Sequence, residues 1–323
     1  GMPPSTPAAV IEWGTLPRQR SAAGTLRDIA DRVRKLGFAP PCTILIGDVV
    51  GLKDELGWYE KLPFFGKKIV VTRAAERCGG LGAKLEELGA GVIELPLIEI
   101  GRISRFAEMD AAIRRISSYD WIVFSSHHGV RSFFDRLADL KLDARALSGV
   151  KVASVGAETS RSLLQRGIRP NLQPARFETS AVLETLKRKS DRLAGKRILL
   201  VKPDIAPRDL EQGLRKMGAE VVRLTAYITR MPKSLPDAAK KAVAAGEADY
   251  VAFTSSSTVQ NFVKAFGLAR VKRIARKTRF LSIGPVTTKT LKSYGLKPYL
   301  QAKTFTLDGL VDALLRRAGK KRP

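Results

Sequence analysis

Short stretches, most of which contain small hydroxyl residues or glycine, follow apolar, strand-like runs at several points along the chain. They span residues 72–73, 125–129, 156–159, 202–204, 254–258 and 284–288. A hydroxyl there caps a helix N-terminus, where amides and the helix dipole attract anions. Each one alone would be an ordinary cap, but their repetition at the carboxyl ends of parallel strands favours binding of carboxylates or phosphates. The binding candidates are Arg73, Ser125, Ser126, Thr159, Lys202, Thr254, Ser255, Ser256 and Thr287.

Motifs for a nucleotide, a nucleophile or a metal are absent from the sequence. It contains no Gly-x-Gly-x-x-Gly after a strand, no phosphate loop and no Gly-x-Ser-x-Gly. The only histidines, His127 and His128, are adjacent; we interpret them as loop residues and predict no metal site. Two cysteines, Cys42 and Cys78, favour a reducing cytoplasm. A reaction here must use electrostatics and positioning, with Tyr227 as a candidate side chain.

The charge of the chain is strongly positive and unevenly distributed. Lys and Arg total 57 against 31 Asp and Glu, a net charge of +26. Residues 1–66 hold 8 basic and 7 acidic side chains, and the remainder holds 49 and 24. The second part should therefore attract a polyanion, whether nucleic acid, anionic lipid or a polycarboxylate metabolite. No apolar run approaches the ~20 residues of a membrane helix, and no signal peptide opens the sequence.

The sequence contains an internal duplication. A displacement of 129 maps residues 66–71 onto 195–200, 88–92 onto 217–221, and 120–126 onto 249–255. A displacement of 128 continues the match from 155–156 to 283–284 and from 167–170 to 295–298. Each block has the pattern of a strand followed by a helix, which predicts two parallel α/β sheets. The equivalent extended stretches 95–100 and 224–229 are candidates for crossings between the two domains.

Residues 66–316 resemble uroporphyrinogen-III synthase. The resemblance rests on the order and spacing of residues 69–74, 88–90, 95–98, 120–126, 129–130, 155–156, 226–227, 253–259, 283–287 and 308–310, while His127 and His128 depart from the family pattern. It implies two similar three-layer α/β domains with parallel sheets, interleaved and joined by a two-stranded linker. One would comprise 66–98 with 231–316 and the other 102–225, followed by a basic tail at 317–323.

The resemblance also implies a reaction. Hydroxymethylbilane, a linear tetrapyrrole with eight carboxylates, loses its hydroxyl and closes through a spiro intermediate to uroporphyrinogen III with ring D inverted, without a cofactor. Tyr227 matches the family tyrosine proposed to assist departure of the hydroxyl, although it could instead seal the cleft as a linker aromatic. Ser126, Thr254, Ser255 and Thr287 match family positions that line the cleft. Hydroxymethylbilane synthase or a methyltransferase of the same pathway are candidate protein partners.

Residues 3–60 resemble the C-terminal end of uroporphyrinogen-III C-methyltransferase. The matching residues are 6–15, 19–20, 24–26, 40–41, 44–50 and Trp58. The preceding half of that enzyme, with its glycine-rich S-adenosylmethionine loop, has no counterpart in this sequence, so we expect no methyl transfer. We predict a small α/β fragment over 1–62, with strand, helix and strand at 10–14, 26–36 and 43–47. Such a fragment should expose apolar surface.

A non-enzymatic alternative is a basic α/β protein that binds nucleic acid or another polyanion, with residues 316–322 as a basic arm. Aromatic residues make up 7% of the chain and do not interleave with a basic stripe, and no helix-turn-helix pattern is present. The sequence therefore favours the synthase over nucleic-acid binding.

Overall fold

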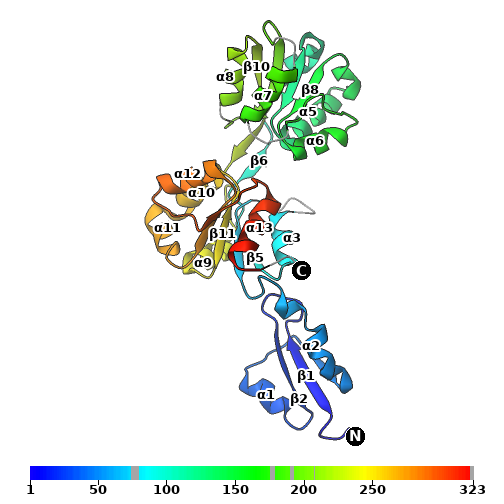
Figure 1. Ribbon diagram of the computed structural model, residues 1–323, viewed down its shortest axis with the longest axis vertical. Coiled ribbons are helices and arrows are strands. Elements are labelled where there is room, and N and C mark those ends of the chain that lie inside the picture. Colours follow the sequence, from blue (N-terminus) through cyan, green and yellow to red (C-terminus); the bar gives the residue numbers. More distant parts are fainter. Residues whose placement is uncertain (74–79, 175–178, 190–192, 207, 321–323) are drawn as a thin grey trace. The chain divides into compact units, whose positions relative to one another are not determined.

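The structure is a computed structural model that describes residues 1–73, 80–174, 179–189, 193–206 and 208–320. The chain forms two compact units (Figure 1). Unit 1 comprises Gly1–Ile98 and Met231–Pro323, and unit 2 comprises Glu99–Arg230. No helix in these ranges is long and apolar enough to cross a membrane.

Unit 1 is built on a parallel sheet with the order β13-β12-β11-β4-β5. Its central strands are apolar and buried because helices pack on both faces, as parallel sheets require. One face carries α9, α10, α11 and α12, and the other carries α3 and α13. The strands are β4 (Lys68–Val71), β5 (Gly91–Glu94), β11 (Tyr250–Phe253), β12 (Arg279–Ser282) and β13 (Leu300–Gln301). The helices are α3 (Leu81–Glu86), α9 (Asp237–Ala245), α10 (Ser256–Phe266), α11 (Leu268–Ile274), α12 (Pro285–Ser293) and α13 (Leu307–Arg317).

Unit 2 has the same construction, with the sheet order β6-β10-β9-β7-β8. All neighbours are parallel except β6, which pairs antiparallel with the end of β10. The strands are β6 (Glu99–Gly101), β7 (Trp121–Phe124), β8 (Lys151–Ser154), β9 (Arg197–Pro203) and β10 (Glu220–Arg230). The helices are α4 (Ala107–Arg114), α5 (His127–Asp139), α6 (Ala157–Leu164), α7 (Thr179–Lys189) and α8 (Asp209–Lys216), with 3-10 turns η3 (Ile116–Ser118) and η4 (Ala144–Leu147).

This architecture confirms the predicted fold class of two similar α/β sheets. The predicted extended stretches end on β6 and β10, which pair antiparallel with each other, and the chain passes between the units at residues 98–99 and 230–231. The sheet of unit 2 is therefore mixed and not entirely parallel as predicted, since β6 runs antiparallel to the other strands.

The N-terminal segment of unit 1 forms a small antiparallel sheet with the order β2-β1-β3. Its elements are β1 (Pro7–Glu12), β2 (Arg20–Thr25), α1 (Ile29–Lys35), β3 (Cys42–Ile46), η1 (Asp48–Leu52), α2 (Lys53–Leu56) and η2 (Tyr59–Lys61). The prediction missed β2, whose sequence RSAAGT lacks the β-branched, alternating pattern of a strand. The expected apolar exposure is present: Ile44, Leu56 and Trp58 are 64%, 63% and 59% exposed.

Candidate functional site

The best-defined part of the predicted site lies in unit 2, where the N-terminus of α5 meets β10. Ser126 follows β7 in an extended conformation and caps α5, accepting a hydrogen bond from the Gly129 amide at 3.1 Å. Its Oγ also lies 2.9 Å from the phenol oxygen of Tyr227. Tyr227 is 5% exposed and packs in the core cluster between α5 and the sheet. Two residues 101 positions apart are therefore joined through their hydroxyl groups.

The hydrogen bond between these two hydroxyls determines what Tyr227 could do chemically. The Ser126 oxygen accepts the Gly129 amide hydrogen and keeps a second lone pair, so either Ser126 or Tyr227 can be the donor in the hydrogen bond between their hydroxyls. Hydrogen-bond donation by a positioned phenol is one form of general acid catalysis.

The two histidines adjoin this pair, and the interpretation of them as loop residues is wrong. His127 and His128 form the first turn of α5, because Ser126 caps the helix directly before them. The ring centroid of His128 is 5.5 Å from that of Tyr227 in an edge-on arrangement, and 4.0 Å from that of His127. Sequence reasoning missed this contact, although the adjacency of His128 to the Ser126 cap was a usable signal. Within the described ranges, no three His, Cys, Asp or Glu residues are placed to hold a metal ion.

The other candidates of unit 2 follow neighbouring strands. Ser125 donates a hydrogen bond to the Val201 carbonyl at 3.1 Å, which ties the end of β7 to β9. Thr159 lies in the first turn of α6 and is 3% exposed. Ser125 is partly buried and Thr159 is buried, and contact with a ligand remains a prediction for each.

Lys202 lies inside β9, where the sequence analysis had placed it in the loop after the strand. It is 2% exposed, and its Nζ is 3.7 Å from Glu211 Oε2 on α8. Burial lowers the pKa of the Lys202 ammonium, with Arg223 acting in the same direction and Glu211 opposing both. Strand alternation directs Lys202 toward α8 with Ile198 and Leu200, whereas Tyr227 belongs to the cluster on the α5 face. These two candidates therefore lie on opposite faces of one sheet.

The candidates of unit 1 cluster where β11 and β12 end. Ser255 caps α10 in a reciprocal capping box with Thr258. The Ser256 hydroxyl donates to the Val286 carbonyl in the first turn of α12, a turn that also holds the 3%-exposed Thr287. Thr254 is partly buried at the end of β11. Arg73, also partly buried, follows the adjacent strand β4, so the structure brings all five candidates to one edge of the sheet.

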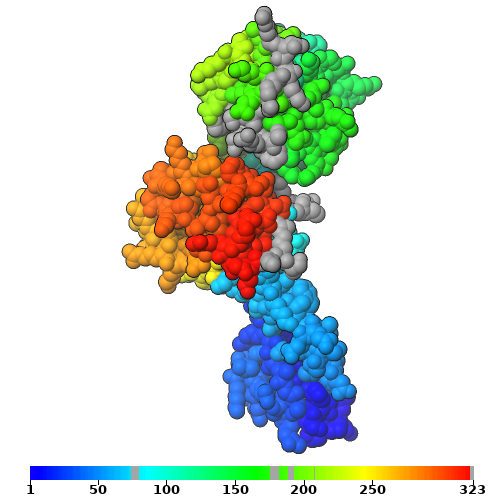
Figure 2. Space-filling model, in the orientation of Figure 1, coloured from blue at the N-terminus to red at the C-terminus, as the bar shows by residue number. Residues whose placement is uncertain are grey.

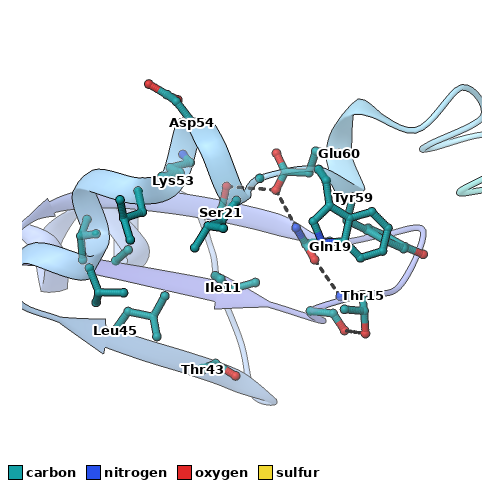
Figure 3. A pocket seen from close by; sticks show the side chains of 18 of the residues that line it. Ile11, Thr15, Gln19, Ser21, Thr43, Leu45, Lys53, Asp54, Tyr59 and Glu60 are labelled. Atoms are coloured by element: carbon teal, nitrogen blue, oxygen red, sulfur yellow. Dashed lines mark hydrogen bonds between the residues drawn. The ribbon is translucent and has the colours of Figure 1, made fainter. Parts of the chain in front are cut away.

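A separate cavity of about 420 Å³ lies in the N-terminal segment and contains none of these candidates. One wall is the sheet face with Ile11, Thr43 and Leu45, and the other is the chain from Val49 to Lys61 (Figure 3). Glu60 accepts hydrogen bonds from Gln19 and Ser21, which holds the two walls together at one end.

Comparison with known proteins gives consistent matches. The family model for uroporphyrinogen-III synthase HemD matches residues 80–312. The chain is 32% identical over 321 residues to porphyrin biosynthesis protein HemD of Ruminiclostridium josui, with 99% of this chain covered. This chain spans 62% of the length of that relative. It is also 32% identical over 262 residues to uroporphyrinogen-III synthase of Synechococcus elongatus, covering 78% of this chain and 96% of that protein.

Two further comparisons concern the N-terminal segment and the fold. The chain is 34% identical over 167 residues to uroporphyrinogen-III C-methyltransferase of Bacillus subtilis, covering 52% of this chain and 34% of that protein. A crystal structure of a mutant uroporphyrinogen III synthase from Thermus thermophilus superposes with a TM-score of 0.55 at 20% identity, covering 78% of this chain and 98% of the other. Both resemblances predicted from the sequence are confirmed.

Proposed function

Because this chain belongs to the uroporphyrinogen-III synthase family, we propose that it is a hydro-lyase that cyclises hydroxymethylbilane to uroporphyrinogen III in tetrapyrrole biosynthesis. The observation that carries this proposal is the family match over residues 80–312, which spans both α/β sheets. The positive charge and the hydroxyl-rich strand ends support it, because the substrate bears eight carboxylates.

Carboxylates of the substrate would be bound in each unit by helix N-termini and their capping hydroxyls. Ser126 in unit 2 and Ser255 in unit 1 are such caps, and Thr287 lies in the first turn of α12. Arg73 would add a charged donor. The chemistry needs no protein nucleophile, because closure depends on holding the two ends of a flexible chain within reach.

Tyr227 is the residue proposed to assist departure of the hydroxyl. Its phenol is anchored by Ser126, so a hydrogen bond to the leaving oxygen would have a fixed direction. Lys202 and Thr159 are both buried in this structure. They could contact the substrate only if a conformational change exposed their side chains.

The test is a coupled assay with purified full-length protein. Hydroxymethylbilane is generated in situ, the products are oxidised, and isomers I and III are separated by chromatography. We expect mainly isomer III with protein present and isomer I, the spontaneous product, without it. Isomer I alone from correctly folded protein would overturn the proposed activity.

Cytoplasmic placement and protein partners are also proposals. Two cysteines in 323 residues support a reducing compartment. Hydroxymethylbilane synthase is the partner that would supply an unstable substrate, and the methyltransferase is the partner that would consume the product. Sedimentation velocity of this chain mixed with each purified enzyme would detect a complex, and unchanged sedimentation coefficients for both would reject these partners.

A further inference from the structure

A basic cavity lies on unit 1, between the C-terminal end of α9 and the helix α11. It has a volume of about 460 Å³, within the range of small-ligand sites. Its floor is formed by Ala244, Ala245, Gly246 and the buried Ile274. Three exposed cations, Arg270, Arg273 and Lys277, surround this floor. Both helices are visible at the surface of unit 1, in yellow and orange (Figure 2).

The charge of this cavity is not balanced by the described parts of the protein. No ion pair within them involves Arg270, Arg273 or Lys277. The acids nearest in the sequence, Glu247 and Asp249, pair with Lys68 and Lys67 instead. The C-terminus of α9 contributes only about half a negative charge, against three full positive charges. A net positive potential therefore remains in a concave, partly apolar site.

The cavity lies at the opposite edge of the sheet from the substrate-binding candidates of unit 1. Gly246 and Lys277 precede β11 and β12, at the amino ends of these strands. Thr254, Ser255 and Thr287 follow the same two strands at their carboxyl ends. Because the two strands are parallel and in register, the cavity is a separate site and cannot share a ligand with those loops.

The duplicated half shows that the basic character is not required by the fold. In unit 2 the segment between α5 and β8 corresponds to the segment between α10 and β12 that contains α11. There Lys141 and Arg145 are the two basic residues and Asp143 is the one acid, and Arg145 is paired with Asp143 at 2.8 Å. In unit 1 the run from 270 to 277 contains five basic residues and no acid. A scaffold that folds with a net charge of +1 in this segment of one copy carries a run of net charge +5 in the other.

We propose that this cavity binds a small, multiply charged anion that carries carboxylate or phosphate groups. Two guanidinium groups and an ammonium can each donate charge-assisted hydrogen bonds to such oxygens. The apolar floor suits the carbon skeleton or the bridging atom between the anionic groups. The proposal does not depend on the synthase activity, since the site is separate from the substrate-binding candidates of unit 1.

The experiment compares two double variants of the full chain by amide NMR in 0.1 M NaCl, with titration by inorganic pyrophosphate and, separately, by citrate. Arg270→Gln with Arg273→Gln removes two cavity cations. Lys272→Gln with Arg276→Gln is the matched control, because it removes the same charge from the same basic run outside the cavity lining. Lys277→Gln is a second cavity variant.

We expect saturable shifts of the amides of 244–246 and 270–277 in the unmodified chain. The dissociation constant should rise about tenfold or more in the cavity double variant and stay within about twofold in the control. Tighter pyrophosphate binding would indicate a phosphate ligand, and tighter citrate binding a polycarboxylate. Absence of saturable local shifts, or equal weakening in both double variants and no effect of Lys277→Gln, would overturn the proposal. Synthase activity in the same variants reports separately on the proposed function.

Discussion

The two α/β units share one backbone arrangement but differ in the side chains that contact their helix caps. Ser126 and Ser255 occupy equivalent positions after equivalent strands, and each caps the following helix by accepting an amide hydrogen three residues on. In unit 2 the Ser126 cap also contacts the phenol of Tyr227. The displacement of 129 places Ile98 at the equivalent position in unit 1, so that cap has no such partner from its duplicate. The duplication thus supplies two similar edges that we propose bind anions, while the side chain of Tyr227 distinguishes the half proposed to act as an acid.

The largest expected effect concerns this distinguishing residue. Tyr227→Phe removes the phenol hydroxyl and keeps the ring that packs against α5. We expect turnover to isomer III to fall about 100-fold, the lower range for loss of a general acid, with little change in KM. Tyr250→Phe is the matched control, because Tyr250 is a buried tyrosine of unit 1 outside the candidate site. The measurement is kcat and KM in the coupled assay.

An unchanged kcat in Tyr227→Phe would show that the Tyr227 hydroxyl has no catalytic role and that the ring acts only in packing. The two units would then not differ by a catalytic tyrosine. A loss of equal size in Tyr250→Phe would point to a general effect of removing a buried hydroxyl. Thermal unfolding of both variants separates these outcomes from misfolding.

A second contrast tests how the two halves differ in packing. Gly89 and Gly218 are equivalent and have positive φ angles of 86° and 84°. A Cβ at Gly89 would lie 2.7 Å from Leu62 Cβ and 3.1 Å from the Phe65 amide nitrogen, whereas at Gly218 its nearest neighbours, in Ala194, are at 3.0 Å. Each change to Ala forces a left-handed conformation that costs about 1–3 kcal/mol. We expect Gly89→Ala to lower the free energy of unfolding more than Gly218→Ala, because the contact with Leu62 is closer.

Denaturant titration of both glycine variants measures this difference. Equal losses would mean that the residues preceding β4 adjust to the added methyl group. A larger loss in Gly218→Ala would show that unit 2 is the less tolerant half.

The caps themselves can be compared directly. Ser126→Ala and Ser255→Ala each remove an N-cap, so each should lower the stability of its helix by about 1 kcal/mol. Ser126→Ala also releases Tyr227, and we expect its kcat to fall about tenfold, with recovery in Ser126→Thr, which restores the hydroxyl. Ser255→Ala should act on KM, as loss of a proposed carboxylate contact. An effect of Ser126→Ala on KM alone would make Ser126 a binding residue without a positioning role.

Much of the fold of both units was predictable from the sequence, and particular residues show why the rest was not. The duplication and the apolar runs at 69–72, 121–124 and 198–201 predicted the sheets, because strands buried on both faces leave a continuous pattern. The Ser126–Tyr227 contact was not predictable from spacing, because it joins residues 101 positions apart through the order in which strands pair. Lys202 was predicted to lie in a loop because a charged residue at the end of an apolar run is typical of a strand end. In the structure it is buried in β9, where Glu211 on α8 provides an opposite charge. The strand β2 was missed because its Ala and Gly residues lack β-propensity.

The smallest expected effect concerns a contact that both halves keep. Asp120 and Asp249 precede equivalent strands, and each binds a strand amide at 2.9 Å and a lysine. The Lys196 hydrogen bond at 2.7 Å, followed by the Arg197 amide, lowers the pKa of the Asp120 carboxyl. The lowered pKa means that the unfolded chain binds the proton more readily. Asp120 therefore stabilises unit 2 above its ordinary pKa of about 4, and this contribution is lost as the pH falls through the folded value.

Asp120→Asn should accordingly cost about 0.5–1 kcal/mol at pH 7, a modest figure because the side chain is 35% exposed. The difference from the unmodified chain should shrink below about pH 4. Asp249→Asn should cost less, because its lysine contact is longer, at 3.2 Å. Trp121 is the one tryptophan in unit 2, so its fluorescence in a Trp13→Phe, Trp58→Phe background isolates the unfolding of that unit. A cost that stays constant from pH 7 to pH 3 would show that Asp120 acts through the geometry of its hydrogen bonds and not through its charge.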